Sequence, residues 1–420
     1  MATATETKAI EDYSLLDNRV QSDPYAFYEL LHREQPVYQM PETGMYMVTK
    51  YESLRFVLTH PEIFSNDTNL AADKSLQGDN HVQYQSILEE KGWGHVQTLQ
   101  RTDPPEHLRY RKLLDRVFTA SRVKTLTPFV DNVSDELIDA FIDRGSCEFI
   151  SEYAMPFPGI IIAEQLGLDR SEIRTFKKWG DAMLAMATKI LDEEQLRATA
   201  AIELEAQHFL ADMFEQRRAH PQDDLISALV HAHGDDMEPL TTHELQNLMH
   251  QLITGGFETT QSAVAHAVWL LARQPELQEM LFENPQKIKR FVEESLRWES
   301  PVQGLFRVTR QDVELDGTMI LKGSFVIVRF GAANRDADKF ECPHKFDMER
   351  SNGGAHLAFG SGGHFCVGAM LARREMTTAI GDITRRMKNI TLAKPMADPV
   401  HEPSLAFLPI AEMHLGFEKR

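Results

Sequence analysis

The chain has 420 residues, 42% of them hydrophobic, and its 44 lysine and arginine residues against 63 aspartate and glutamate residues leave a net charge of −19. This acidic balance disfavours nucleic-acid binding. Three widely spaced cysteines, Cys147, Cys342 and Cys366, form neither a disulfide framework nor a zinc pattern, which suits a reducing compartment. The polar segment 1–8 lacks the apolar run of a signal peptide or a membrane span, so we expect a cytoplasmic protein without a membrane anchor. Because no linker or repeat interrupts the sequence, residues 1–420 are predicted to form a single domain.

Two residues near position 110 are candidates for binding an anion. In the segment 103–111, which reads DPPEHLRYR, His107 and Arg111 lie one helical turn apart, so both can point at the same negative group. Taken singly, each residue is more typical of a solvated surface charge.

The segment 241–273 is predicted to form one long helix of about 30 residues. Thr241 and Glu244 have the spacing of a capping box, and an apolar stripe follows until Pro275. The middle of this helix reads GGFETT over 255–260. Two glycines in a helix cost about 1 kcal/mol each relative to alanine, and a nearby threonine hydroxyl can compete for a backbone carbonyl. The helix is therefore either bent for a function or closely packed against another backbone.

A second helix is predicted from Pro285 to Trp298. Its residues Glu294 and Arg297 are three positions apart, which by spacing alone describes a surface pair worth a few tenths of a kcal/mol. Short alternating segments at 313–315 and 324–328, separated by glycine-containing turns, are typical of strands.

The most informative segment is 359–368, which reads FGSGGHFCVG and leads into a predicted helix over 369–387. A cysteine at the start of a helix meets unpaired N–H groups and the positive end of the dipole, which favour a metal-binding thiolate. A buried structural cysteine is the alternative. Together these elements predict a mainly α protein with many helices and small β-sheets.

The pattern F-x-x-G-x-x-x-C-x-G, carried by Phe359, Gly362, Cys366 and Gly368, closely resembles the haem-binding loop of the cytochrome P450 monooxygenases. The resemblance implies the cytochrome P450 fold and a haem b cofactor, iron protoporphyrin IX, with Cys366 as the proximal iron ligand. Phe359 would then pack beside the sulfur, while Gly360, Gly362 and Gly368 would let the backbone turn and approach the porphyrin.

Two further motifs resemble those of the same family. Gly255 with Glu258 and Thr259 matches the oxygen-activation motif, in which the distorted helix makes room for dioxygen and the acid and alcohol deliver protons. The spacing of Glu294 and Arg297 matches an interior pair that is completed by an arginine before the haem loop. Arg350 is that third member, and we assign these three residues to folding and haem retention.

The resemblance also implies partners for the two haem carboxylates. His107 and Arg111 match one group of propionate-binding residues, and Arg307 and His364 match two others. We leave His356 out, because a histidine before an apolar turn is usually structural.

The implied activity is hydroxylation of an apolar small molecule, such as a terpenoid, a steroid, a fatty compound or an aromatic compound, using O₂ and two electrons. The electrons would come from a ferredoxin or flavodoxin with an NAD(P)H-dependent reductase, and we expect a monomer. Basic residues offer a docking patch or simply solvated helix faces: Arg101, Arg109, Lys112, Arg116, Arg373 and Arg374.

The substrate pocket is expected to include the stretch before Asp103 and four mainly apolar segments, 183–186, 251–255, 302–306 and 405–407. Gln303 or His250 could orient a polar group of the substrate. Two other functions stay open: a peroxide-driven oxygenase of the same fold, and a non-catalytic haem protein that binds a ligand.

Overall fold

The protein is described by a computed structural model that covers residues 9–72, 78–188, 191–232, 238–393, 396 and 398–420. The segment 1–8, on which the expectation of no anchor rests, lies outside these residues. Among the residues described, no helix is both long and apolar enough to cross a bilayer.

Helices make up most of the described chain, as the sequence predicts. They are α1 (Asn18–Ser22), α2 (Tyr25–Glu34), α3 (Tyr51–Thr59), α4 (Gly78–Lys91), α5 (Glu106–Val117), α6 (Ala120–Asp139), α7 (Pro156–Gln165), α8 (Ile173–Thr188), α9 (Glu193–Ala219), α10 (Leu225–Val230), α11 (Thr242–Arg273), α12 (Pro275–Glu283), α13 (Ile288–Trp298), α14 (Phe330–Ala333) and α15 (Ala369–Arg386).

The strands form small sheets. They are β1 (Val37–Gln39), β2 (Tyr46–Val48), β3 (Phe64–Ser65), β4 (Ser146–Glu148), β5 (Gly304–Thr309), β6 (Val313–Leu315), β7 (Thr318–Ile320), β8 (Phe325–Arg329), β9 (Met387–Leu392), β10 (Val400–His401), β11 (Ile410–Glu412) and β12 (His414–Lys419). The largest sheet has the order β1-β2-β8-β5-β3, in which β2 and β8 are parallel and the other pairs are antiparallel. A second sheet has the order β4-β12-β9 and includes β12, the last strand of the described chain.

The long helix α11 begins at the predicted capping box. The backbone N–H of Thr241 donates to Glu244 Oε2 at 2.7 Å, and the N–H of Glu244 donates back to Thr241 Oγ1 at 3.2 Å. The helix then runs for 32 residues. Every residue from Thr260 to Leu271 is buried, because α7, α15 and β9 pack around this half of the helix.

The next predicted helix is confirmed with a later start. A 3₁₀ turn occupies Pro285–Lys287, and the α-helix begins at Ile288. The turn after β6 is also as predicted, because Asp316 and Gly317 both have positive φ angles, of 47° and 75°.

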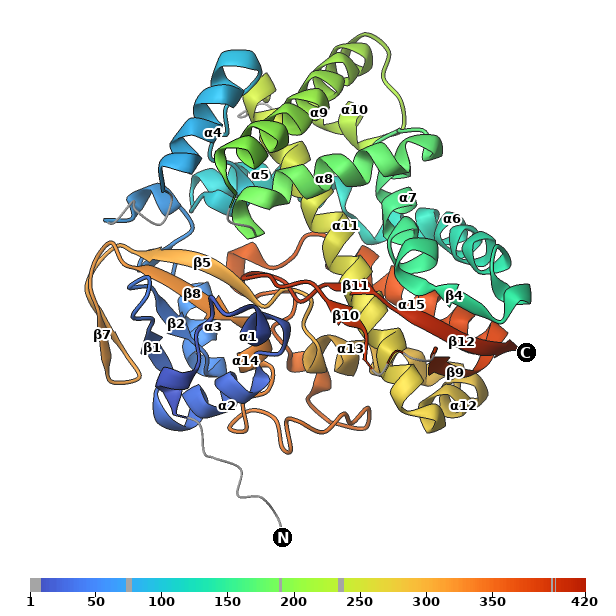
Figure 1. Cartoon of the computed structure of the whole chain (residues 1–420). Coiled ribbons are helices and arrows are strands. Elements are labelled where there is room, and N and C mark those ends of the chain that lie inside the picture. Colours follow the sequence, from blue (N-terminus) through green and yellow to red (C-terminus); the bar gives the residue numbers. More distant parts are fainter. Residues whose placement is uncertain (1–8, 73–77, 189–190, 233–237, 394–395, 397) are drawn as a thin grey trace.

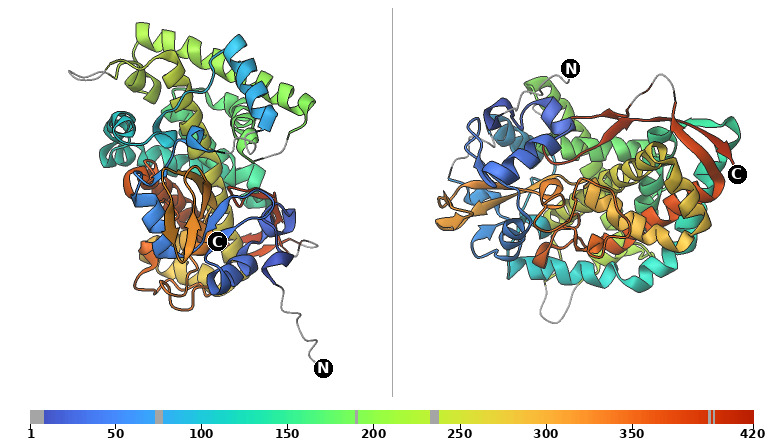
Figure 2. Two further views of the ribbon diagram at one scale, coloured as in Figure 1. Left: turned by 90° about the vertical axis from the view of Figure 1, so that its left-hand side faces the viewer. Right: turned by 90° about the horizontal axis from the view of Figure 1, so that it is seen from below.

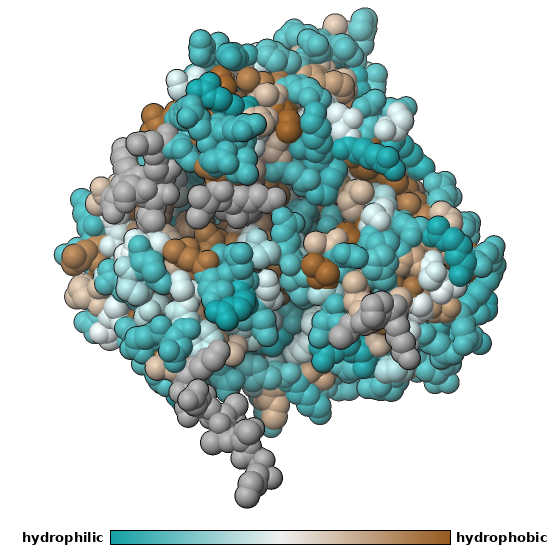
Figure 3. Space-filling model, viewed as in Figure 1, coloured by the Kyte–Doolittle hydropathy of each residue, from teal (hydrophilic) through white to brown (hydrophobic). Residues whose placement is uncertain are grey.

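The elements are arranged around α11. In Figure 1 this helix crosses the molecule, with the five-stranded sheet on one side and the helices α6, α7 and α15 on the other. In the right-hand view of Figure 2, the blue and orange strands of this sheet also lie together toward one end of the molecule. The face seen in Figure 3 is mainly hydrophilic, and its apolar side chains form only small separate groups.

The pair Glu294 and Arg297 lies in the interior, so the surface reading of its spacing is wrong. The Arg297 side chain is 0% exposed and donates to the Glu294 carboxylate through Nε and Nη2, each at 2.8 Å. Arg350 Nε donates to Glu294 Oε1 at 3.4 Å, and the backbone N–H of Asp347 donates to the same oxygen at 2.9 Å. The expected third member of the group is therefore present.

Candidate functional site

A cavity of about 1590 Å³ lies between α11, strand β5 and the loop that contains Cys366. The segments expected to form the pocket all contribute to its wall. Its apolar lining includes Met183, Leu252, Ala263, Leu305, Phe306, Leu405 and Phe407. An apolar cavity with a few polar groups is the usual form of a small-molecule site.

Cys366 faces this cavity from the turn that precedes α15. Its own backbone N–H donates to the carbonyl of Phe359 at 2.9 Å, which closes the loop between the two residues. Burial raises the pKa of the Cys366 thiol, while the N–H groups of Gly368 and Ala369 and the charge of Arg111 act in the opposite direction. Burial therefore opposes ionisation of the thiol, and a cation at the sulfur would favour the thiolate form.

The glycines of the loop have different roles. Gly362 has a φ angle of +71°, and a Cβ there would lie 2.9 Å from the backbone oxygen of Leu58 in α3. Its glycine requirement therefore comes from contact with α3 and not from the porphyrin side. Gly360, with a φ angle of +74°, and Gly368 both line the cavity together with Phe359.

The four side chains expected to bind the two haem carboxylates all line the cavity: His107, Arg111, Arg307 and His364. The His107 and His364 rings contact each other in a tilted arrangement, with centroids 4.0 Å apart. Burial, followed by the charges of His107 and Arg307, lowers the pKa of His364 to about 3. Burial also lowers the pKa of Arg307 to about 10, so this guanidinium remains charged near neutral pH.

Two of these groups lack partners that burial would normally demand. Among the described residues, His107 Nδ1 is buried without a hydrogen bond, and Arg307, which is 4% exposed, donates only to the carbonyl of Phe306 at 2.7 Å. Buried polar groups are nearly always satisfied. An anionic group entering the cavity would satisfy both.

Sequence reasoning missed the residues that hold this cluster in place. Asn66 Nδ2 lies 2.9 Å from His364 Nε2, and the backbone N–H of Asn66 donates to Asp103 Oδ1 at 2.9 Å. Asp103 also accepts from Arg310 Nη2 at 2.6 Å. No local sequence pattern marks Asn66 as functional. Asp103, by contrast, lies in the segment 103–111 that contains His107 and Arg111.

Of the two residues of the α11 motif, Thr259 lines the cavity and Glu258 does not. Thr259 lines the cavity and donates its hydroxyl to the carbonyl of Gly255 at 2.7 Å, which confirms the expected competition for a backbone carbonyl. Gly255 lines the cavity as well, whereas Glu258 is half-buried and is not part of the cavity wall.

Two sequence interpretations need correction. Gln303 does not reach the cavity, because it is 1% exposed, accepts from Tyr28 Oη at 3.1 Å and donates to the carbonyl of Ser300 at 2.8 Å. Arg101 does not belong to a surface patch, because it lines the cavity. His250 is part of the cavity wall, as expected.

The rest of the basic patch is partly neutralised. Arg109 is bound to Glu244 in an ion pair, and Arg373 binds Glu293 Oε1 through Nε at 2.7 Å. Arg374 is paired with Asp131. Lys112 and Arg116 on α5 are exposed.

Comparison with known proteins identifies the family. The cytochrome P450 family model matches residues 18–412. The chain is 32% identical to cytochrome P450 107B1 of Saccharopolyspora erythraea, over 92% of this chain and 93% of that protein. It is also 32% identical to 6-deoxyerythronolide B hydroxylase of the same organism, over 91% and 93% of the two chains. Cytochrome P450 monooxygenase PikC of Streptomyces venezuelae is 32% identical over 92% and 89%.

Solved structures agree with this identification. Cytochrome P450 CREJ in complex with (4-ethylphenyl) dihydrogen phosphate superimposes with a TM-score of 0.88 and 29% identity, covering 98% of this chain and all (100%) of that one. P450BioI in complex with an acyl carrier protein ligated to hexadec-9Z-enoic acid gives a TM-score of 0.83 and 30% identity over 96% and 99%. The chain belongs to the cytochrome P450 family and is a haem-binding monooxygenase of that family.

The family's cofactor, haem b, fits the residues around the cavity. Its two propionates would supply anionic partners for His107 and Arg307, and its iron would supply a cation for the Cys366 sulfur.

Proposed function

We propose that the protein hydroxylates an apolar small molecule with O₂ and two electrons from a ferredoxin-type partner, as a single cytoplasmic domain that acts as a monomer. The observation that supports this function most directly is the position of Cys366 in the wall of an apolar cavity that Thr259 also lines. Free cysteines at all three positions agree with a reducing compartment.

We assign the proposed site residues as follows. Cys366 would bind the iron, with Phe359, Gly360, Gly368 and Gly255 contacting the porphyrin. His107, Arg111, Arg307 and His364 would bind the propionates. When bound, haem supplies the iron at which O₂ is reduced and one oxygen atom is activated for insertion into a C–H bond.

Thr259 and Glu258 would control proton delivery. Because the Thr259 hydroxyl donates its hydrogen to the Gly255 carbonyl, its oxygen keeps lone pairs with which to accept a hydrogen bond from water in the cavity. Glu258, which is half-buried on the next face of α11, would pass protons from solvent to that water.

Replacing Thr259 by alanine is expected to leave haem binding intact while most reducing equivalents are lost to peroxide. Positioned proton-transfer groups contribute about 10²–10⁴-fold, so we expect product formation to fall by about 100-fold while NAD(P)H consumption falls far less. Product and peroxide are measured per NAD(P)H consumed. Thr259→Ser keeps the acceptor oxygen and should restore most of the coupling.

Thr384→Ala is the matched control, because Thr384 also donates to a carbonyl one turn earlier, that of Ile380 at 2.7 Å, but lies outside the cavity. Unchanged coupling in Thr259→Ala would contradict the proton-delivery role. A loss of coupling in Thr384→Ala would show that disturbing the helix backbone is enough to divert electrons to peroxide, without any role of the hydroxyl in proton delivery.

The electron-transfer partner is expected to dock near α5 and the Cys366 loop. Arg111 donates from α5 to the carbonyl of Phe365, so the exposed side chains of Lys112 and Arg116 lie on a helix that touches this loop. Apolar side chains are exposed nearby, with Leu108 at 46%, Phe365 at 40% and Met370 at 44%. This combination suits an acidic ferredoxin or flavodoxin.

Reversing one charge tests this surface. Lys112→Glu is expected to slow reduction by the ferredoxin about 10-fold at low salt, with a difference that shrinks as salt is added, because exposed charges are screened. The measurement is the rate of haem reduction by stopped flow. Lys322→Glu, an exposed charge beyond β7, is the control. A loss that salt does not change would indicate misfolding and contradict the docking role.

One reconstitution experiment decides among the functions. With a ferredoxin, its reductase and NAD(P)H, substrate-dependent consumption of NAD(P)H with formation of a hydroxylated product supports the proposal. Product with peroxide but none with the ferredoxin system would identify a peroxide-driven oxygenase. Binding without turnover in either system would identify a non-catalytic ligand-binding protein.

A further inference from the structure

The cavity has a polar region well away from Cys366. It is formed by His81 on α4, His95 and Arg101 in the connection between α4 and α5, and His250 on α11, all of which line the cavity. His250 precedes Thr259 by nine positions, and a rise of 1.5 Å per residue separates them by about 13 Å along α11. We call these four residues the roof group.

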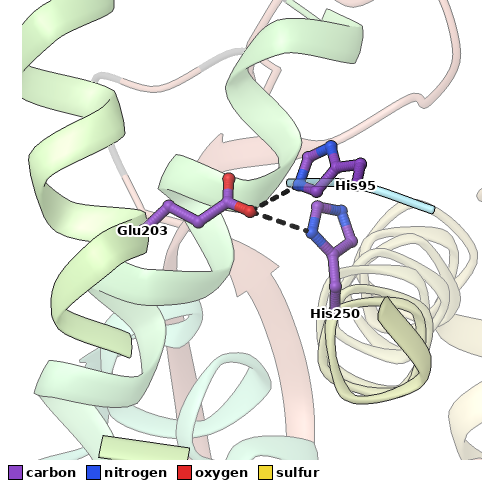
Figure 4. A group of neighbouring side chains, drawn as sticks. All are labelled: His95, Glu203 and His250. Atoms are coloured by element: carbon purple, nitrogen blue, oxygen red, sulfur yellow. Dashed lines mark hydrogen bonds and ion pairs between the residues drawn. The ribbon is translucent and has the colours of Figure 1, made fainter. Parts of the chain in front are cut away.

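Behind this wall lies a buried acid, Glu203 of α9, which is 1% exposed and is not part of the cavity lining. Figure 4 shows how its carboxylate meets His95 and His250. Oε1 lies 2.6 Å from His95 Nε2 and 3.6 Å from His250 Nδ1, while Oε2 accepts from Tyr84 Oη at 2.6 Å. Burial alone would raise the pKa of Glu203, but His95 and His250 lower it well below its usual value. The carboxylate is therefore charged, and its contacts are with these neighbouring side chains.

The ligand atoms of His95, Glu203 and His250 all lie within 4.8 Å of one another, a spacing that a metal ion could also use. Gln85 argues against this reading. Its Oε1 accepts the backbone N–H of His95 at 3.0 Å, so its Nε2 donates to His95 Nδ1 at 2.8 Å. His95 Nε2 therefore carries the ring proton and donates to Glu203 instead of offering a lone pair to a metal.

Arg101 is the one charged member of the roof group with no neutralising contact. Within the described ranges, its guanidinium has no hydrogen bond or ion pair, and burial lowers its pKa although Glu203 raises it. Its charge contributes to the lowered pKa of His81 and of His250, its neighbours in the roof group. The short 3₁₀ helix that contains it, Leu99–Arg101, is held to α11, because Gln100 N–H donates to Gln251 Oε1 at 3.0 Å and Gln251 Nε2 donates to Thr98 Oγ1 at 2.8 Å.

The acids on the cavity wall do not cancel this charge. Glu89 and Glu402 are exposed, and Glu375, whose pKa is raised by burial, lies on α15, the helix that follows Cys366. The Arg101 guanidinium, which is partly exposed and lines the cavity, is therefore available to an anion, and a charge-assisted hydrogen bond is among the stronger contacts that a ligand can make.

We propose that Arg101 binds the anionic headgroup, a carboxylate or a phosphate monoester, of an otherwise apolar substrate. This inference rests on the proposed function and specifies its substrate class. The headgroup sits in the roof group, with His250 and His81 as further polar contacts, and the apolar chain extends along α11 toward Thr259. Because about 13 Å of helix separates His250 from Thr259, oxidation falls on carbons remote from the headgroup.

Ligands that differ only in the headgroup test this directly. Dodecanoate, dodecyl phosphate and dodecan-1-ol are titrated into the holoprotein, and affinity is measured by calorimetry and by the optical shift of the haem. A charge-assisted contact is worth about 1.5–3 kcal/mol, so Arg101→Gln should weaken at least one anionic ligand by about 10- to 100-fold and change the alcohol by less than about 2-fold. Arg101→Lys should retain part of the affinity. The better of the two anions identifies the headgroup.

Three controls keep the outcome clear. Arg33→Gln, an exposed arginine on α2, should change nothing. Haem content and the carbon monoxide spectrum of Arg101→Gln should equal those of the parent, which separates headgroup recognition from haem loss. Titration after treatment with EDTA should give the same preference, and a preference that disappears would assign it to a bound metal and overturn the inference.

Equal affinity of the parent protein for dodecan-1-ol and both anions would also overturn it, as would an equal loss for all three ligands in Arg101→Gln. These results would leave the monooxygenase proposal standing, because the thiolate spectrum and ferredoxin-dependent turnover test that proposal separately.

Discussion

Replacing Cys366 by serine is expected to abolish the absorbance band that marks thiolate ligation in the reduced, carbon monoxide-treated holoprotein. A serine oxygen donates far less electron density to iron than a thiolate does, and that donation favours O–O cleavage. We expect product formation to fall by about 1000-fold or more, which corresponds to about 4 kcal/mol of transition-state stabilisation. The measurements are the carbon monoxide difference spectrum and product formation with a saturating ferredoxin system.

Cys342→Ser is the matched control, because Cys342 is an exposed free cysteine outside the cavity. It should leave both the spectrum and turnover unchanged. Retention of the thiolate band in Cys366→Ser would disprove the assignment of this sulfur as the iron ligand, and with it the proposed roles of Phe359 and Gly368.

The second large effect concerns stability. Glu294→Gln is expected to lower the free energy of unfolding by about 3–5 kcal/mol, because it leaves Arg297, whose side chain is 0% exposed, buried without an anion. Arg350 loses the same partner. We expect faster haem loss as well, since Arg350 lies a few residues before the haem loop. The measurements are urea unfolding of the holoprotein and the rate of haem transfer to an acceptor protein.

Glu349→Gln is the control, because Glu349 is paired with Lys287 and Arg290 at an exposed position. It should leave the unfolding midpoint unchanged. If the two variants lose equal stability, the interior pair contributes no more than a surface pair. Should Glu294→Gln fail to accumulate, Arg350→Gln tests the same network with a smaller expected loss, because Glu294 then keeps both bonds to Arg297.

Much of the architecture could be predicted because the signals are local. The capping box at Thr241, the apolar stripe after it and the Asp316–Gly317 turn depend on residues within a few positions, and the structure contains all of them. The later start of α13 shows the usual limit of such signals, because a proline fits a 3₁₀ turn as well as a first α-helical turn.

Other properties depended on residues far apart in the sequence. The spacing of Glu294 and Arg297 is the same on a surface and in a core, and burial followed only from the packing of the segment around Arg350 against α13. The sequence suggested that Gln303 is available to a ligand, but Tyr28, 275 positions earlier, donates a hydrogen bond to its amide oxygen. Arg101 was grouped with surface cations because its own neighbours do not reveal that α11 and α4 enclose it.

The family, the mainly helical fold and the cysteine loop could be predicted from the amino-acid order, because a ten-residue motif and the capping and turn patterns each lie within a few consecutive residues. Which side chains face the cavity, and which charges lack a partner, became evident only in the folded protein. Burial and ion pairing depend on contacts between segments that are far apart in the sequence, and local patterns do not indicate which segments pack together.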